Sequence, residues 1–174
     1  MLTITDKGAA INSTIVGIYA NTLYKIEYRI RTNHHWETTS FEIKSQLYNT
    51  IEIIDIRKEG KESWYVNGQA DQKFNGCIDI DISLTPFTNT LPINRLKLLE
   101  KEEEQIKVLY VDVLGRKMMP VQQKYTKLSQ TDYKYENVPN VFESVIVVDD
   151  LGLVVKYPGL FKRTYITESN YQLP

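Results

Sequence analysis

Two aspartates at alternate positions of one apolar segment are the residues best suited to chemistry in this 174-residue chain. Asp79 and Asp81 lie in CIDIDISL, residues 77–84, where isoleucines take the positions between them. A period of two predicts a strand with both carboxylates on one face, about 6.5–7 Å apart. Carboxylates at that spacing act as general acid and base in inverting glycosidases, and they also bind sugar hydroxyls. A solvated outer strand face has the same pattern.

A polar run follows these aspartates and interrupts the alternation. It reads TPFTNTLPINRL, residues 85–96, and its candidate ligand-binding residues are Thr85, Phe87, Thr88, Asn89 and Arg95. Threonine and asparagine side chains bind ligands at such sites, and they equally cap helices and close turns. The arginine pairs either with Asp79 or Asp81 or with a ligand phosphate or carboxylate. The sequence leaves both alternatives open.

Aromatic residues are the second source of candidate ligand contacts. Trp and Tyr combine a large apolar body with a polar tip, which suits a lipid chain or a sugar ring, although tyrosines at the rim of a β core look the same. The aromatic candidates for a pocket are Trp36, Trp64, Phe87, Tyr110, Tyr125, Tyr133, Tyr135 and Tyr157. Of these, Trp64, Phe87, Tyr125 and Tyr157 join the predicted ligand-binding set.

The remaining reactive side chains predict no further chemistry. The single cysteine, Cys77, has no neighbouring base and is typical of a small core residue. His34 and His35 lie in an expected hairpin turn, and the sequence has no third histidine to complete a zinc site. Phosphate-cradling glycine patterns and a Gly-x-Ser-x-Gly elbow are missing from the sequence. We therefore assign no catalytic residue, no metal ligand and no cofactor.

The elements that position these residues are predicted to be strands. Ile, Val and Thr number 18, 13 and 15, so 46 of 174 residues are β-branched, against only 4 Ala. β-branched side chains favour a pleated surface over a helix, which excludes a helical bundle. The sequence predicts a mainly β single domain over residues 1–174, with about nine to eleven strands in a curved antiparallel sheet.

Alternation places most of these strands along the chain. The clearest is residues 23–31, LYKIEYRIR, with 36–44 as its hairpin partner and 51–57 as a strand with a bulge at the adjacent Ile53 and Ile54. Further strands are expected at residues 77–84, 105–114, 119–128, 132–137, 141–148 and 153–157. Thr90 is expected to cap a short helix from Leu91 to Leu99, with Pro92 in its first turn.

Charge and the N-terminal residues limit the partners. Lys plus Arg is 21 and Asp plus Glu is 22, a formal net charge of −1, whereas nucleic-acid binding usually requires a basic surface. We recognise neither a signal peptide in residues 1–20 nor an apolar run long enough to span a membrane. We therefore expect a cytoplasmic protein without a nucleic-acid partner or membrane insertion, and the oligomeric state stays open.

The block GCIDIDISLTPFTNTLPINRL, residues 76–96, resembles the hallmark segment of the putative glycolipid-binding family of bacterial proteins, a PA1994-like domain of unknown function. Residues that match the family pattern are Gly76, Cys77, Asp79, Asp81, Thr85, Pro86, Phe87, Thr88, Asn89, Thr90, Leu91, Pro92, Ile93, Arg95 and Leu96. Supporting matches are Trp64, Gly68, Val111, Gln123, Tyr125, Asp149, Gly152, Tyr157, Pro158 and Gly159. Asn94 stands where the family has a first arginine.

This resemblance implies a β half-barrel similar to the bacterial lipoprotein-localisation proteins, with one or two short helices filling or covering its concave side. It implies a non-catalytic module that binds a glycolipid, fatty-acyl compound or other amphiphile in the concave face. Two alternatives remain: a hydrolase-like enzyme that uses Asp79 or Asp81 with Arg95, and a structural or interaction protein without a small ligand.

Overall fold

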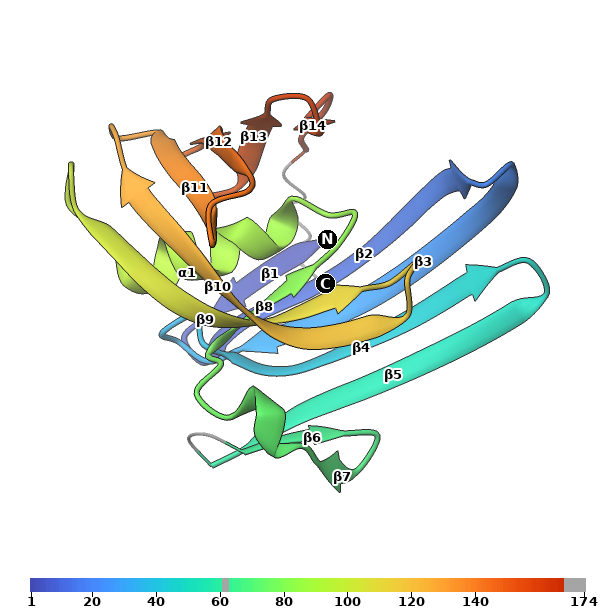
Figure 1. Cartoon of the computed structure of the whole chain (residues 1–174). Coiled ribbons are helices and arrows are strands. Elements are labelled where there is room, and N and C mark those ends of the chain that lie inside the picture. The colour runs from blue at the N-terminus through green and yellow to red at the C-terminus, as the bar shows by residue number, and fades with distance from the viewer. Residues whose placement is uncertain (61–62, 168–174) are drawn as a thin grey trace, which may run out of the picture.

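Two seven-stranded sheets make up the described part of the chain, residues 1–60 and 63–167 of a computed structural model (Figure 1). In both sheets every strand pairs with its neighbour in the sequence. Sheet A contains β1 (Leu2–Thr5), β2 (Gly8–Tyr19), β3 (Thr22–Thr32), β4 (Thr38–Leu47), β5 (Thr50–Glu59), β6 (Ser63–Val66) and β7 (Gln69–Ala70). Sheet B contains β8 (Asp79–Ile82), β9 (Glu103–Asp112), β10 (Lys117–Lys127), β11 (Asp132–Val138), β12 (Glu143–Val148), β13 (Val154–Tyr157) and β14 (Phe161–Lys162).

Sheet A follows the alternation in the sequence. In β3 the side chains of Tyr24, Ile26, Tyr28 and Ile30 are buried, because each even position faces the other sheet. The expected bulge at Ile53 and Ile54 was wrong: β4 and β5 pair without a register shift from Ser40↔Arg57 to Leu47↔Thr50. Ile54 packs against the core, whereas Ile53 lies on the exposed outer face of β5. The adjacent apolar pair therefore reflects an exposed isoleucine and not a bulge.

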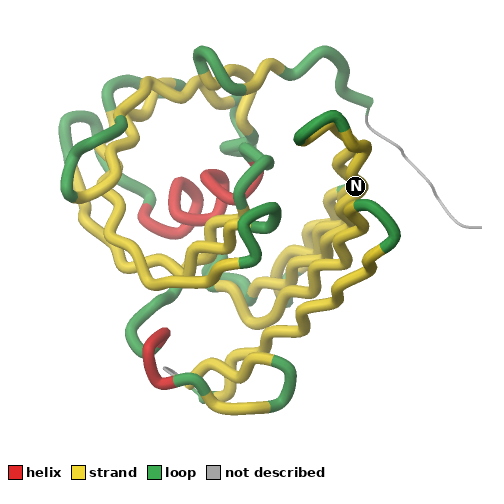
Figure 2. Tube along the Cα trace, turned by 45° about the vertical axis from the view of Figure 1, so that its right-hand side comes forward, coloured by secondary structure: helices red, strands yellow, loops and turns green. Residues whose placement is uncertain are grey.

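Sheet B curls into a half-barrel, as Figure 2 shows. Its strands are antiparallel, except that β8 at the edge runs parallel to β9. The segment from Ser83 to Glu102 makes this connection, and it carries the helices of the half-barrel: the 3-10 helix η2 (Phe87–Asn89) and the helix α1 (Thr90–Leu96). A third short helix, η1 (Gln72–Phe74), precedes β8. The strands of sheet B curve round α1, which fills the concave side (Figure 2).

The start of α1 differs from the prediction. Thr90 is not the cap but the first residue of the helix, with helical φ and ψ of −62° and −30°, because η2 leads directly into α1. The hydroxyl of Thr90 is buried without a hydrogen-bond partner among the described residues. The helix ends at Leu96, before the predicted Leu99, since Lys97 adopts a left-handed conformation with φ of 50°. Pro92 does lie in the first turn.

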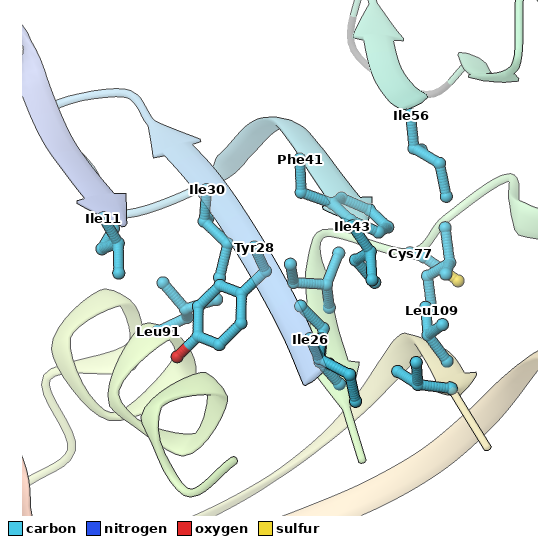
Figure 3. Close-up of a cluster of buried hydrophobic side chains, with 14 of the residues drawn as sticks. Ile11, Ile26, Tyr28, Ile30, Phe41, Ile43, Ile56, Cys77, Leu91 and Leu109 are labelled. Carbon is cyan, nitrogen blue, oxygen red and sulfur yellow. The ribbon is translucent and has the colours of Figure 1, made fainter. Parts of the chain in front are cut away.

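Two hydrophobic clusters hold the layers together. The first lies between the sheets, where Ile26, Tyr28 and Ile30 of sheet A face Leu91 of α1 and Leu109 of sheet B (Figure 3). The second lies between α1 and the concave face of sheet B, and it is rich in tyrosine. Its members are Ile93, Leu98, Ile106, Val108, Tyr125, Tyr133, Tyr135, Ile146, Val148 and Tyr157.

The predicted fold class, a mainly β half-barrel with a short helix on its concave side, is confirmed. The described residues hold fourteen strands, more than expected, and β1, β2, β6, β7 and β14 lie outside the ranges that the alternation located. Within residues 1–60 and 63–167, none of the helices has the length and apolar character that a membrane crossing requires.

Candidate functional site

Strand β8 positions the two aspartates at the centre of the half-barrel. Ile80 and Ile82 face the cluster between the sheets, so Asp79 and Asp81 face α1 and η2. The side chain of Asp79 is 0% exposed, so the interpretation of this face as a solvated outer surface was wrong. Because β8 is an edge strand covered by a helix, its polar face is enclosed by the molecule's own residues.

Asp79 forms a closed ion pair with Arg95 in the last turn of α1. Nη2 of Arg95 lies 2.6 Å from Oδ2 of Asp79, and Nε lies 3.1 Å from each carboxylate oxygen. Burial raises the pKa of the Asp79 carboxyl, and the guanidinium opposes that rise. Arg95 was expected to pair either with an aspartate of the chain or with a ligand anion. In the structure it forms a bidentate ion pair with Asp79. A ligand phosphate would have to compete with Asp79 for this guanidinium.

Asp81 is bound only by neutral donors among the described residues. Oγ1 of Thr88 donates to Oδ1 at 3.0 Å, and Nε2 of Gln123 on β10 donates to Oδ2 at 2.7 Å. Burial raises the pKa of Asp81, while these two hydrogen bonds lower it. The residue is half-buried, unlike Asp79. Sequence reasoning did not include Gln123 in the site, although its match to the family pattern in QQKYT was a usable signal.

The Thr85–Asn89 corner joins the two sheets. The hydroxyls of Thr85 and Tyr28 are 2.9 Å apart, and the Thr85 hydroxyl also accepts the backbone N–H of Phe87 at 3.2 Å. Tyr125 donates its hydroxyl to Oδ1 of Asn89 at 2.8 Å. Tyr28 was absent from the predicted site because nothing in its strand distinguishes it from other core tyrosines. The corner has the local structural role that was one reading of these residue types.

Trp64 lies apart from the other predicted residues. Its Nε1 donates to the backbone carbonyl of Cys77 at 2.9 Å, and its ring packs edge-on against Phe41 with centroids 6.3 Å apart. It is 1% exposed and belongs to the cluster between the sheets. Cys77 is buried as expected, and burial raises the pKa of its thiol to about 11.

Tyr157 lies on the concave side with an aromatic group. Its ring packs edge-on against Tyr135 at 6.3 Å, and Phe161 lies at the same centroid distance. Burial is the largest cause that raises the pKa of Tyr157, and the charge of Asp81 adds to it. The structure therefore brings Tyr125 and Tyr157 to the side of Asp81, whereas Trp64 belongs to another layer.

An apolar cavity of about 330 Å³, open to solvent on one side, lies between the sheets beside the Thr85–Asn89 corner. Its apolar walls include Leu2, Ile11, Phe87, Leu153, Val154 and Ile166. Polar side chains from Ser13, Thr85 and Arg163 also contribute to the lining. A larger hollow of about 800 Å³ on the outer face of sheet A is lined by charged residues such as Glu27, Arg29 and Lys44. The first has the chemistry of a site for an apolar group, and the second does not.

Two packed β-sheets, a helix filling the half-barrel and an apolar cavity beside a polar corner define a class of half-barrel protein. The chain belongs to the family described as Putative glycolipid-binding, whose model matches residues 1–163. It is similar to a DUF1089 family protein (PA1994) from Pseudomonas aeruginosa, known from a crystal structure, with 32% sequence identity and a TM-score of 0.84. That match covers 94% of this chain and 90% of the other. A search of curated proteins found no match. The resemblance of residues 76–96 to this family is thereby confirmed.

Proposed function

We propose that this protein is a non-catalytic binding module for an amphiphile, and that the apolar chain of the ligand enters the cavity between the sheets. The carrying observation is the cavity of about 330 Å³ with mainly apolar walls. This volume lies within the range of small-molecule sites, which typically combine apolar walls with a few polar groups. The family description, Putative glycolipid-binding, supports a ligand of this kind.

The cavity wall gives the proposal a quantitative form. Burial of one methylene group contributes about 0.8 kcal/mol, so each added methylene tightens binding about fourfold until the cavity is full. Association costs and ordering of the chain subtract from the total but change little between neighbouring chain lengths. A stepwise gain with chain length, followed by a plateau, is therefore the expected signature.

The enzyme alternative has weaker support in the geometry. Asp79 is 0% exposed and both of its oxygens bind Arg95, so a substrate would have to break a bidentate ion pair to reach it. Asp81 is half-buried, and with Asp79 engaged by Arg95 the pair of free carboxylates that an inverting glycosidase needs is not present here. The alternative of a structural protein without a small ligand agrees with the internal Asp79–Arg95 pair. It does not account for the apolar cavity.

A cavity-filling variant tests this proposal against a close control. Leu153 lines the cavity, whereas Leu151, two residues earlier, is 52% exposed and lies outside it. We expect Leu153→Trp to reduce binding of octyl tetraethylene glycol ether at least tenfold in calorimetric titrations, and Leu151→Trp to leave it unchanged. Circular dichroism and thermal unfolding establish that both variants fold. Equal binding by the two folded variants would contradict the chain site.

Native mass spectrometry gives a second readout of the same proposal. The octyl ether should remain bound to the wild-type protein and to Leu151→Trp as a single adduct. It should be absent from Leu153→Trp at the same concentration. Several adducts of equal abundance on all three proteins would indicate surface adsorption and contradict a defined cavity.

A further inference from the structure

An aromatic group on the concave side of sheet B lies beside Asp81, and neither the ion pair nor the apolar cavity uses it. We name it the tyrosine cluster; its members are Tyr110, Tyr135, Phe142, Tyr157 and Phe161. They come from β9, β11, the residue before β12, β13 and β14, so every strand of the half-barrel from β9 to β14 except β10 contributes a residue or a flanking residue. Asp81 on β8 extends this series by one strand.

Register and ring contacts fix the arrangement of the cluster. Asp81 is the register partner of Tyr110 on the adjacent parallel strand, so their side chains share a face. Tyr135 packs against Phe142 with centroids 6.1 Å apart and against Tyr157 at 6.3 Å, and Phe142 lies 6.3 Å from Tyr157. These three rings thus form a nearly equilateral triangle. Phe142 is 39% exposed, so the triangle reaches the protein surface.

Two hydroxyls of the cluster have no hydrogen-bond partner within residues 1–60 and 63–167. Tyr135 and Tyr157 are 8% and 5% exposed, so more than nine-tenths of each residue is buried. Among the described residues neither hydroxyl makes a hydrogen bond, in contrast to Tyr125, which binds Asn89. Among the described residues, Thr38 and Thr90 have hydroxyls that are fully buried and lack a hydrogen-bond partner. The hydroxyls of Tyr135 and Tyr157 are not in this group, so they retain some contact with solvent. Buried polar groups normally have a partner, and here a ligand hydroxyl can supply it.

Asp81 adds an acceptor at the same place. An ionised carboxylate has about four lone-pair sites, and Thr88 and Gln123 occupy two of those on Asp81. Burial is the main cause that raises the pKa of Tyr135 and Tyr157, and the charge of Asp81 contributes in both. The two hydroxyls therefore stay protonated at neutral pH and can both donate and accept. Tyr125 connects them to the carboxylate, because its ring packs against Tyr135 at 5.5 Å and its hydroxyl lies 3.5 Å from Oε1 of Gln123, which binds Asp81. The carboxylate of Asp81 is a stronger acceptor than a neutral oxygen.

The charge of the surroundings selects among polar head groups. The guanidinium on this face, that of Arg95, is already neutralised by Asp79, while Asp81 has no cationic partner among the described residues. A phosphate or carboxylate would meet Asp81 without a free cation to offset the repulsion. A neutral ring with several hydroxyls can instead pack on an aromatic side chain and donate to the carboxylate.

We propose that the tyrosine cluster and Asp81 form a binding site for a neutral glycosyl group, the head group of the amphiphile. As a head-group assignment this rests on the proposed function, because it takes the sugar and the chain to be parts of one ligand. The link between the two sites is the helix η2, in which Phe87 lines the apolar cavity and the next residue, Thr88, binds Asp81. The sugar site can be tested without any lipid chain.

The test is an NMR titration of protein with ¹³C-labelled tyrosine rings, using a panel of methyl glycosides with gluco, galacto, manno and N-acetylglucosamine configurations. We expect at least one glycoside to shift the ring signals of Tyr135 and Tyr157. Asp81→Asn should weaken that binding about tenfold and Tyr157→Phe about fivefold, as expected for the loss of one hydrogen bond each. Tyr133→Phe is the matched control, because Tyr133 has the same 5% exposure as Tyr157 but lies under Lys127 and outside the ring contacts that join Tyr135, Phe142 and Tyr157. It should leave binding unchanged.

Inorganic phosphate and tetramethylammonium, titrated in the same way, give the contrary outcomes. Shifts of Tyr135 and Tyr157 by either ion, without shifts by any glycoside, would overturn the sugar site in favour of an ionic head group. Shifts by none of the probes would overturn it as well. Chain binding, measured separately with the octyl ether and Leu153→Trp, would still stand in both cases. A glycoside response in a protein that does not bind the octyl ether would instead refute the amphiphile proposal and leave a sugar-binding protein.

Discussion

Asp79 and Asp81 lie two residues apart on the same face of β8, and their surroundings differ in kind. The region of Asp79 is closed: the carboxylate is 0% exposed and bound at both oxygens by one arginine. The region of Asp81 is half-open, with two neutral donors and accessible tyrosine hydroxyls nearby. The same residue type on the same strand thus forms an internal ion pair at Asp79, whereas at Asp81 it is the residue we propose to bind a ligand.

The difference arises from the segment that covers β8. The last turn of α1 places Arg95 over Asp79, whereas η2 presents only the hydroxyl of Thr88 to Asp81. Asn94, where the family has an arginine, donates to the backbone carbonyl of Leu151 at 2.9 Å. Its amide lies so close to Gly152 that a Cβ atom there would approach within 2.8 Å, and Gly152 also has φ of 72°. The helix is therefore fixed at the closed end.

The largest expected effect is on the closed region. Arg95→Met leaves a buried carboxylate without its cation, so we expect the free energy of unfolding to fall by about 3–5 kcal/mol. Urea denaturation measures this loss. Adding Asp79→Asn to Arg95→Met removes the stranded charge and should recover part of it. A loss below about 1 kcal/mol in Arg95→Met would mean that the pair does not hold the helix on β8.

A smaller effect is expected at the hydrogen bond between Tyr125 and Asn89. Tyr125→Phe leaves Oδ1 of Asn89 buried without its donor, and we expect a loss of about 1–3 kcal/mol in unfolding free energy. Tyr110→Phe is the control, because Tyr110 is half-buried and makes no hydrogen bond among the described residues. Equal losses in the two variants would show that the hydroxyl of Tyr125 has no structural importance.

The open region should respond to pH through Asp81. Its pKa in the folded state is raised by burial, so the folded state binds a proton more readily than the unfolded chain. Its contribution to stability is therefore present at low pH and lost as the pH rises from the unfolded pKa of about 4 through the folded value. Asp81→Asn removes this dependence. Relative to the wild type, its unfolding free energy should increase between acidic and neutral pH, as measured by urea denaturation at several pH values. Parallel curves would contradict a raised pKa.

The smallest effect on stability is expected from Tyr157→Phe. Because the hydroxyl of Tyr157 has no partner among the described residues, its removal should change the free energy of unfolding by less than about 0.5 kcal/mol. Thermal unfolding tests this expectation. A loss above about 1 kcal/mol would place the hydroxyl in a structural network and remove it from the group available to a ligand.

The sequence predicted the strands better than the site. Alternation located β3 within one residue at each end, since its buried face reads as an unbroken series of Tyr and Ile. It could not show that Asp79 is buried, because burial of that face depends on α1, which returns to β8 across the intervening chain. The contact between Asp81 and Gln123 joins residues 42 positions apart, and no local pattern records such a pairing. The family resemblance supplied the identities of the corner residues but not their partners.

The central claim is that the cavity between the sheets binds an apolar chain, and a chain-length series tests it most directly. Calorimetric titrations of the wild-type protein would use hexyl, octyl, decyl and dodecyl tetraethylene glycol ethers below their micelle concentrations. The claim predicts a gain of about fourfold in affinity per methylene up to a plateau, and loss of this gain in Leu153→Trp. Affinity that is independent of chain length, or an undiminished gain in Leu153→Trp, would contradict it.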